Sequence, residues 1–182
     1  MKRTSVFYFA TILTLFTVSN ISAQDYEFSP EHHFHKINID NSTDYLPEYL
    51  NGIYLGMPLA EFANIKDTLF LTTMKSDSLE WIGYKEDVND DRINNIFYKF
   101  DSVPDSINDT LPLFEIIINF IHLEQADEFV ESKFHEPLIK DIPTYKQWIL
   151  KTNKNFALIV KQYNNEVKLI GTIAGAEWDP ND

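Results

Sequence analysis

The sequence predicts an α+β fold, in which two helices pack on one face of a single, mostly antiparallel sheet. Three observations predict this fold. Residues 112–122 alternate as a half-covered strand does, and the apolar period becomes helical from Leu123 onward. Five further strand-like runs and one further helical run flank this stretch. Their order is a helix followed by three strands, twice, which indicates two helix-plus-three-strand units without a repeat of residues.

The strand at 112–122 is the expected centre of the sheet. Phe114, Ile116, Ile118 and Phe120 fall on one face, which we expect to contact both helices. The other face is mixed, as in a strand with one packed and one partly wet side, and carries Leu113, Glu115, Ile117, Asn119 and Ile121.

Two segments have helical apolar spacing. The segment 123–134 ends shortly before Pro137, and its apolar residues are Leu123, Ala126, Phe129, Val130 and Phe134. The segment 59–65 follows a short strand at 52–55, a turn at Gly56 and a proline suited to the first helical position. Its apolar face carries Leu59, Phe62, Ala63 and Ile65.

The remaining strands are separated by polar turns. The runs 79–85 and 92–101 join across 86–91. The pairs Asn153-Lys154 and Asn164-Asn165 separate the last three strands, because Asn tolerates the positive φ of a tight turn. Those strands are expected at 145–152, 156–163 and 166–173.

The first 23 residues have the pattern of a secretory signal peptide. Lys2 and Arg3 precede an apolar run at 6–18, and Ala23 is a small residue suited to cleavage before Gln24. The chain has no cysteine, so a lipid anchor on a mature N-terminal cysteine is excluded. We expect a periplasmic or secreted protein without a membrane anchor after cleavage. The expected organisation is a signal peptide at 1–23, an N-terminal arm at 24–51 and one α+β domain at 52–182.

The composition excludes several classes of partner. The formal charge is −13, and loss of Lys2 and Arg3 with the signal makes it −15. Such a surface repels nucleic acid and anionic lipid, which bind through Lys and Arg. It suits solubility outside the cell, or a cationic partner. Without cysteines there is no disulfide framework, and a chain of this length can rely on one hydrophobic core.

The arm and one turn carry metal-like patterns that we expect not to bind metal. In the arm, Glu31, His33 and His35 would share a face if extended, but no distant fourth ligand is evident. In the turn, Asp87, Asn89 and Asp91 alternate as calcium ligands do, whereas the glycine and the bidentate glutamate of a calcium loop are missing. A polar hairpin tip explains the turn, and no cofactor is implied.

Catalytic signatures are equally weak. The chain has no cysteine nucleophile, Gly-x-Ser-x-Gly elbow, phosphate-binding glycine loop or His-Glu-x-x-His pair. Glu115 would be a candidate only if buried, and an ion pair explains it equally well. His122, between the central strand and the helix, suits a structural role. We therefore name no catalytic residue and expect that the protein is not an enzyme.

One short pattern recurs more often than the composition predicts. Asp, then Ser or Thr, then an aliphatic residue occurs five times, with the hydroxyl at Thr68, Ser78, Ser102, Ser106 and Thr110. The tripeptides resemble the acceptor of a periplasmic O-glycosylation system of some Gram-negative bacteria. The alternative is that they punctuate turns, since Asp, Ser and Thr cap nearby backbone N–H groups.

The stretch from Gly52 through Ile53, Leu55, Gly56 and Met57, followed by a helix, resembles the start of small secreted bacterial envelope proteins. These include the outer-membrane assembly lipoproteins of the SmpA/OmlA type and β-lactamase-inhibitor-like folds. The resemblance covers about fifteen residues, which is the length of a short motif rather than of a domain. This chain departs from it by lacking the lipid-anchoring cysteine and by having three strands after each helix. The resemblance implies a non-catalytic helix-on-sheet module that binds proteins.

Together these features predict a soluble accessory protein of the bacterial cell envelope, which binds an unknown protein partner through the sheet face that the helices leave free. Aromatic residues anchor such interfaces, and the candidates are Tyr84, Tyr98, Trp148 and Tyr163, which are alternatively core residues. One alternative function is a small extracytoplasmic enzyme acting on a glycan or peptide. Another is weak capture of a metal or calcium by the acidic surface.

The glycosylation hypothesis makes a testable prediction. The intact mass of the protein from its native host should exceed the mass of its polypeptide, and Ser102→Ala, Ser106→Ala and Thr110→Ala together should remove much of the excess. Mass spectrometry measures both quantities. A native mass equal to that of the bare chain would leave these residues with a turn role only.

Overall fold

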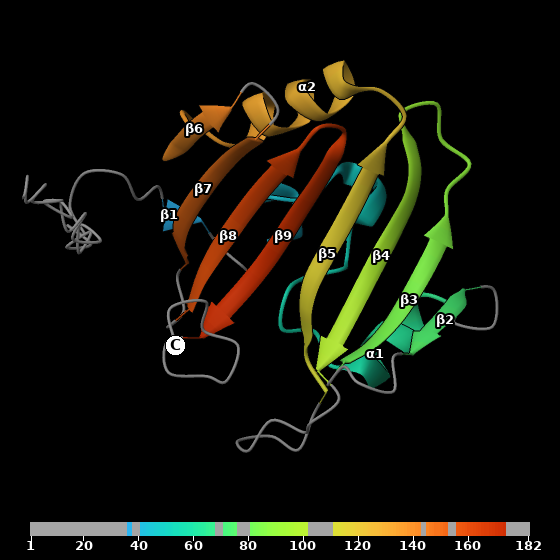
Figure 1. Ribbon diagram of the computed structural model, residues 1–182. Helices are drawn as coiled ribbons and strands as arrows, with labels where there is room; N and C mark the ends of the chain where they lie inside the picture. Colours follow the sequence, from blue (N-terminus) through green and yellow to red (C-terminus); the bar gives the residue numbers. More distant parts are fainter. Residues whose placement is uncertain are drawn as a thin grey trace, which may run out of the picture.

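The computed structural model describes residues 36–37, 41–67, 71–75, 81–101, 111–142, 145–152 and 156–173. Nine strands of this part form one sheet, accompanied by two α-helices (Figure 1). The helices are α1 (Leu59–Ile65) and α2 (Leu123–Lys133). The strands are β1 (Lys36–Ile37), β2 (Thr72–Lys75), β3 (Trp81–Asp87), β4 (Ile93–Asp101), β5 (Leu113–Phe120), β6 (Ile139–Ile142), β7 (Tyr145–Thr152), β8 (Phe156–Tyr163) and β9 (Glu166–Ile173).

The sheet is mostly antiparallel, and the expected α+β class is confirmed. Its order is β1-β7-β8-β9-β5-β4-β3-β2, with β6 also paired to β7. The seven strands from β2 to β7 along this path are paired antiparallel, and β1 lies parallel to β7. More of the described residues lie in strands than in helices.

Each helix is followed by four strands rather than the three expected. The prediction missed β2 and β6, which have four residues each and are too short to show a period. The first unit is therefore α1 with β2 to β5, and the second is α2 with β6 to β9. The units meet where β5 pairs with β9, antiparallel. A twofold axis through that pair would generate this mirrored strand order.

Most predicted boundaries agree with the structure. The bounds of α1, β7, β8 and β9 are those expected, and Asn164 has the positive φ of 53° expected in the turn between β8 and β9. The expected strand at 52–55 is wrong, since Gly52 and Gly56 adopt φ of 89° and 87° and turn the chain. The segment instead hydrogen-bonds to the start of β5, from Gly56 N to Leu113 O at 2.7 Å.

Alternation along the strands gives the sheet two faces. The core face carries Ile96, Tyr98, Ile116 and Ile118, all fully buried. The outer face carries the residues between them, such as Phe97 and Ile117. The hydrophobic cluster of the core includes residues of both helices and of the core face, and it does not include outer-face residues.

A register shift corrects the expected faces of β5. Lys99 pairs with Glu115 and Phe100 with Leu113, so Phe114 is an extra residue in β5. Leu113, expected on the opposite face, therefore enters the core fully buried, whereas Phe114 is half-buried. Ile116, Ile118 and Phe120 lie in the core as expected.

The helices bury narrower faces than their sequences suggest. In α1 only Phe62 is buried, and Ala63 and Ile65 are exposed. In α2 the residues Ala126, Phe129 and Val130 are buried, whereas Leu123 in the first turn is exposed. Within the described part of the chain, no helix is long and apolar enough to cross a membrane.

The arm packs on the core where the structure describes it. Residues 41–50 form two short 3-10 turns, Ser42–Asp44 and Glu48–Leu50. Tyr45, Leu46 and Leu50 are fully buried members of the core cluster. The hydroxyl of Tyr45 also accepts a hydrogen bond from Leu55 N at 3.0 Å, which fixes the arm to the segment before α1.

Candidate functional site

A cleft of about 560 Å³ lies between the second 3-10 turn, the β3–β4 hairpin and α2. Its floor is apolar and is formed by Ile93, Phe120 and Phe129, all nearly buried. Its rim is polar, and includes Tyr49, Glu48, Asp90, Arg92, Glu128 and Lys133. A volume of this size is typical of small-molecule pockets, so the rim decides what chemistry the cleft can support.

The hairpin tip that borders the cleft is held by its own aspartate. Asp90 Oδ1 accepts hydrogen bonds from Arg92 N at 2.7 Å and from Ile93 N at 3.1 Å. Asp87, Asn89 and Asp91 are exposed, and Asp87 pairs with Lys85 at 2.6 Å. The expected hairpin is confirmed by the antiparallel pairing of β3 with β4. Among the described residues, no group of three His, Cys, Asp or Glu side chains is placed to hold a metal ion.

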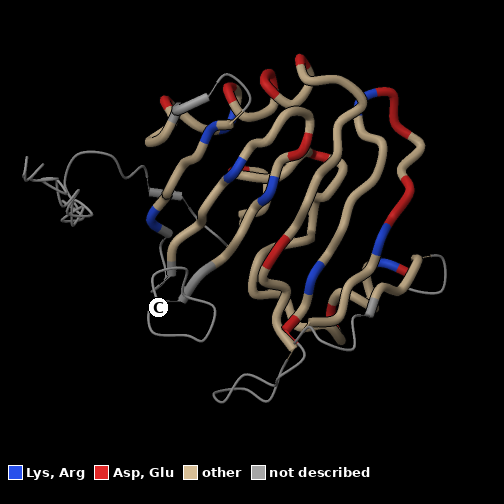
Figure 2. Tube along the Cα trace, viewed as in Figure 1, with Lys and Arg blue, Asp and Glu red and all other residues tan. Residues whose placement is uncertain are grey.

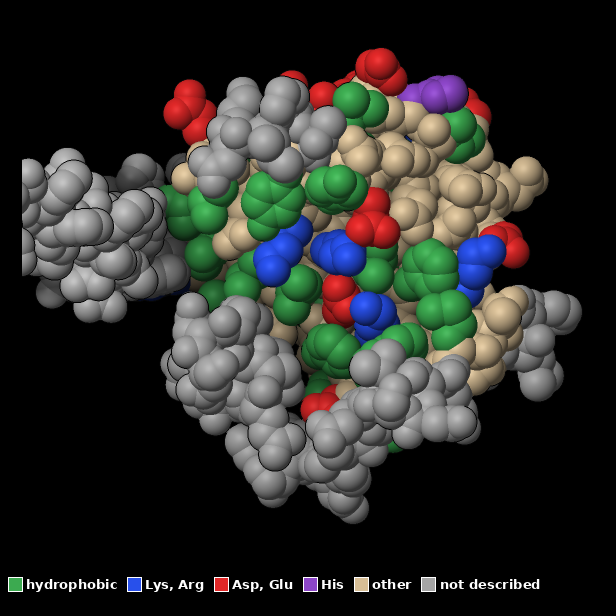
Figure 3. Space-filling view, in the orientation of Figure 1, with side chains coloured by type: hydrophobic (Ala, Val, Ile, Leu, Met, Phe, Trp, Pro, Cys, Tyr) green, Lys and Arg blue, Asp and Glu red, His purple; other side chains and the backbone are tan. Residues whose placement is uncertain are grey.

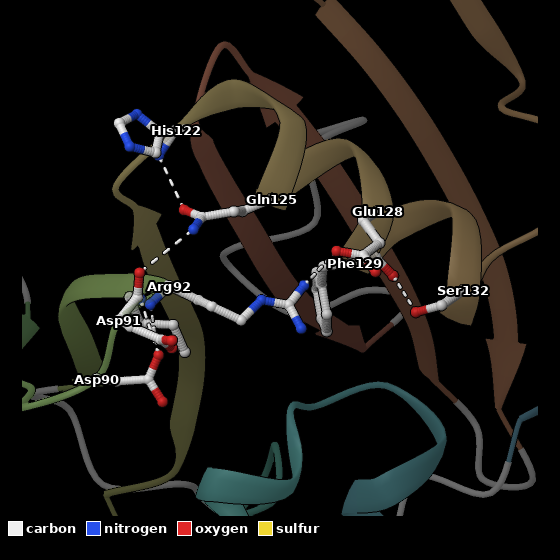
Figure 4. Close-up of polar contacts among 9 residues, drawn as sticks. Asp90, Asp91, Arg92, His122, Gln125, Glu128, Phe129 and Ser132 are labelled. Carbon is white, nitrogen blue, oxygen red and sulfur yellow. Dashed lines mark hydrogen bonds and ion pairs between the residues drawn. The ribbon is translucent and has the colours of Figure 1, made fainter.

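The same hairpin is tied to α2 at its start and in its middle (Figure 4). Arg92 Nη2 lies 2.7 Å from Glu128 Oε2 across the cleft. Gln125 accepts a hydrogen bond from His122 N at 3.0 Å and donates one to Asp91 O at 3.3 Å. His122 is therefore an exposed N-cap residue, in keeping with the structural role expected for it.

Several polar groups of the rim are engaged in contacts within the protein. Ser132 donates its hydroxyl to Phe129 O at 2.8 Å within α2, and Lys133 donates to Thr43 O at 2.5 Å. Glu128 is occupied by Arg92. One common form of nucleophilic catalysis uses a hydroxyl or thiol beside a general base. The rim side chains described here do not form such a pair.

Beside the cleft, a half-buried carboxylate joins the arm, α1 and the sheet. Glu86 accepts hydrogen bonds from Tyr98 at 2.5 Å, Tyr49 at 2.7 Å and Lys66 at 3.0 and 3.1 Å. Burial alone would raise the pKa of Glu86, but these hydrogen bonds and the charge of Lys66 lower it below its ordinary value. Burial, the hydrogen bond to Glu86 and the nearby negative charges raise the pKa of Tyr49 to about 12.

The pKa of Tyr98 is also raised, by burial first and then by the charge of Glu86. The phenol therefore remains the donor and the carboxylate the acceptor at neutral pH. The Glu86 network has the geometry of a structural anchor.

The outer face of the sheet differs from both sites, because it is broad and faces away from the core. Its residues lie in rows across the strands. A central row contains Gln147, Lys161, Lys168, Ile117, Phe97, Lys85 and Thr72, from β7 to β2. An isoleucine row beside it contains Ile149, Ile159, Ile170, Glu115, Lys99 and Gly83. A tyrosine row on the other side contains Tyr145, Tyr163, Glu166, Asn119, Asn95 and Asp87.

Apolar and basic side chains are interleaved on this face (Figure 3). Ile117 and Ile159 are buried although neither belongs to the core cluster. The tube in Figure 2 shows lysine positions spread over β3, β4, β8 and β9. At one side Lys99 pairs with Glu115 at 2.5 Å and lies 5.2 Å from the Trp81 ring centroid.

Trp81 packs over Gly83, where a Cβ would come within 2.5 Å of the indole. Glycine is therefore required there to let the ring lie flat on the sheet.

The structure places the candidate residues of the sequence analysis on different faces of the sheet. Tyr98 and Trp148 belong to the core, and Tyr84 packs against it, so these three do not form the free surface. Tyr163 is exposed on the outer face. Glu115 is buried there, which was the condition for a catalytic candidate, and it also forms the ion pair with Lys99 that the alternative interpretation predicted.

Other singled-out residues lie outside the described part of the chain. They are the arm residues Glu31, His33 and His35 and the five hydroxyl residues Thr68, Ser78, Ser102, Ser106 and Thr110.

The network around Glu86 was not predicted, because its partners are separated by up to 37 residues.

Comparisons with known proteins gave no relative. No family model, curated protein or solved structure matches this chain. The resemblance to envelope proteins through residues 52–57 therefore stays a prediction.

The Glu86 network predicts a pH-dependent contribution to stability. Glu86→Gln should lower the free energy of unfolding at pH 7 by about 1–3 kcal/mol, because Lys66 loses its counter-charge and Tyr98 its acceptor. The folded-state pKa of Glu86 lies below the ordinary 4.5, so its stabilisation is present above that pH and is lost as pH falls through the folded-state value. The difference between wild type and variant should therefore shrink in acid.

Urea unfolding across this pH range measures the effect. The control is Glu61→Gln. Glu61 is exposed and, within the described residues, accepts one side-chain hydrogen bond, from the Tyr54 hydroxyl at 2.9 Å, so its substitution should cost less than about 0.5 kcal/mol. A difference that stays constant with pH would show that the charge of Glu86 is not what stabilises the fold.

Proposed function

We propose that this chain is an exported, non-catalytic accessory protein of the bacterial cell envelope, and that it binds a protein partner through the outer face of its sheet. The signal pattern at 1–23 and the absence of cysteine support export as a periplasmic or secreted protein without a lipid anchor. The resemblance through residues 52–57 supports a protein-binding role. O-glycosylation at the Asp-Ser/Thr tripeptides is part of the same proposal.

The observation that carries the proposal is the apolar character of the outer face. Ile149, Ile170 and Phe97 are only partly buried there, beside the buried Ile117 and Ile159. A contiguous apolar patch on a soluble protein marks an interaction site more often than scattered single residues do. Interleaved lysines keep this patch soluble, as charged residues do around protein–protein interfaces.

The arrangement of the helices favours the same face. The core cluster joins Phe62 of α1 and Phe129 of α2 to the core-face side chains Tyr98, Ile118 and Leu169. We infer that both helices pack on that one face, together with the arm. In the part of the chain that the structure describes, the outer face then has no helix on it, and Tyr163 of that face is more than half exposed.

The enzyme alternative draws on the cleft, whose volume would admit a small ligand. Its carboxylates are exposed and its Ser132 hydroxyl is committed to Phe129 O. Metal or calcium capture would draw on the acidic hairpin, where Asp87 is paired with Lys85 and Asp90 caps backbone N–H groups. The outer face therefore supports a function better than either alternative.

Site-specific photo-crosslinking tests the proposal. A benzophenone amino acid in place of Tyr163, on the outer face, should form a crosslink to a discrete protein in the native host. The same group in place of Ile65, which is exposed on α1 rather than on the outer face, should not. Equal crosslinking from both positions, or from Ile65 alone, would move the binding surface off the outer face.

With the purified partner, the change in binding affinity can be measured. Ile170→Asp places a charge in the apolar patch and should weaken binding at least about tenfold, or about 1.4 kcal/mol. Ile65→Asp is the matched control and should leave the affinity unchanged. Circular dichroism of both variants separates lost binding from lost folding.

A further inference from the structure

The central row of the outer face is basic in an acidic protein. Lys161, Lys168 and Lys85 lie in this row, which contains no acidic residue from β7 to β2. The whole chain has 28 acidic residues against 15 basic ones, so acids were available in excess. The basic row therefore needs a local explanation.

Lys161 and Lys168 stand directly opposite each other on β8 and β9. Like charges in directly opposed positions of neighbouring strands destabilise a sheet. Lys168 is compensated by Glu166 at 3.2 Å, in a pair that is about one-third exposed. Lys161 forms no ion pair with any residue that the structure describes. Among the described residues, the pair thus carries one more positive charge than its ion-pair partner Glu166 compensates.

Besides Glu166, three isoleucines flank this charge. Ile159 precedes Lys161 by two residues on the same face, Ile170 follows Lys168 by two, and Ile117 is paired with Lys168. Strands lie roughly 5 Å apart, so both ammonium groups can reach one carboxylate above the sheet. A polyphosphate backbone needs an extended basic surface, whereas this basic row is short and belongs to a protein of net negative charge, which repels phosphates. A protein segment offers an acidic side chain and apolar neighbours together.

We propose that Lys161 and Lys168 jointly bind a carboxylate of an acidic segment in the partner protein, while apolar side chains of that segment pack on Ile117, Ile159 and Ile170. This inference rests on the proposed function of the outer face. It adds the chemistry of the partner, namely Asp or Glu flanked by apolar residues. The long-range field of the chain opposes such a partner, so the contact is local and selects a particular segment.

The test uses a displayed library of random twelve-residue peptides, selected on the immobilised protein. Selected peptides should carry Asp or Glu beside apolar residues. Synthesised peptides should bind about tenfold more weakly to Lys161→Gln and to Lys168→Gln. Glu166→Gln should strengthen binding, because it removes the acid that competes for Lys168. The control Lys133→Gln, on α2 away from the outer face, should leave binding unchanged.

Three results would overturn the inference, and they differ in whether the proposed function of the outer face is retained. Peptides without acidic residues whose binding is lost in Ile170→Asp would retain the outer face as a binding surface and remove the role of the lysine pair. Peptides insensitive to Ile170→Asp, Lys161→Gln and Lys168→Gln would remove the proposed function as well. If no peptide is selected and heparin binds in a Lys161-dependent manner, the ligand is a polyanion and not a protein.

Discussion

The antiparallel pairing of β5 with β9 is the interaction on which the rest of the structure depends. These are the last strands of the two units, and their pairing converts two meanders into one continuous sheet. On one face the junction packs Ile116 against Leu169 and Ile118 against Val167, all fully buried. On the other face it brings Ile117 beside Lys168 and Glu115 beside Ile170. The core and the proposed binding surface are therefore products of the same register.

Each helix is held to its own unit by a half-buried ion pair, and the two pairs have opposite polarity. At the end of α1, Lys66 pairs with Glu86 of β3, and Tyr98 of β4 completes the site. In α2, Asp127 pairs with Lys146 of β7 at 2.8 Å, and Gln162 of β8 donates to the same carboxylate at 2.6 Å. Such pairs add modest net stability, and they fix which groups must meet. The α1 end supplies the cation Lys66 and α2 supplies the anion Asp127, so exchanging the two helices would place like charges together.

The sequence predicted the parts of this fold that have long, regular patterns. The bounds of β7, β8 and β9 followed from apolar alternation and from asparagine turns such as Asn164. The four-residue strands β2 and β6 were missed because a period cannot be read from so few positions. The extra residue Phe114 was missed because a bulge is set by pairing with β4.

Assignment of side chains to a face was harder. Tyr98 and Trp148 were candidates for the free surface, and both are buried in the core. Alternation along a strand shows only that its residues divide into two sets on opposite faces. The pairing register with the neighbouring strands decides which of the two faces is buried. The lysine pair at Lys161 and Lys168 depends on the β8–β9 register in the same way.

The proposed function depends on a sheet with one face covered and the other open to solvent. The most direct test is NMR of isoleucine methyl groups with a soluble paramagnetic gadolinium chelate, which relaxes nuclei that solvent can reach. The methyl groups of Ile149 and Ile170 on the outer face should relax strongly, and those of Ile96, Ile116 and Ile118 should be protected. Equal protection of both sets would show that the outer face is covered in the free protein, and would contradict its assignment as the binding surface.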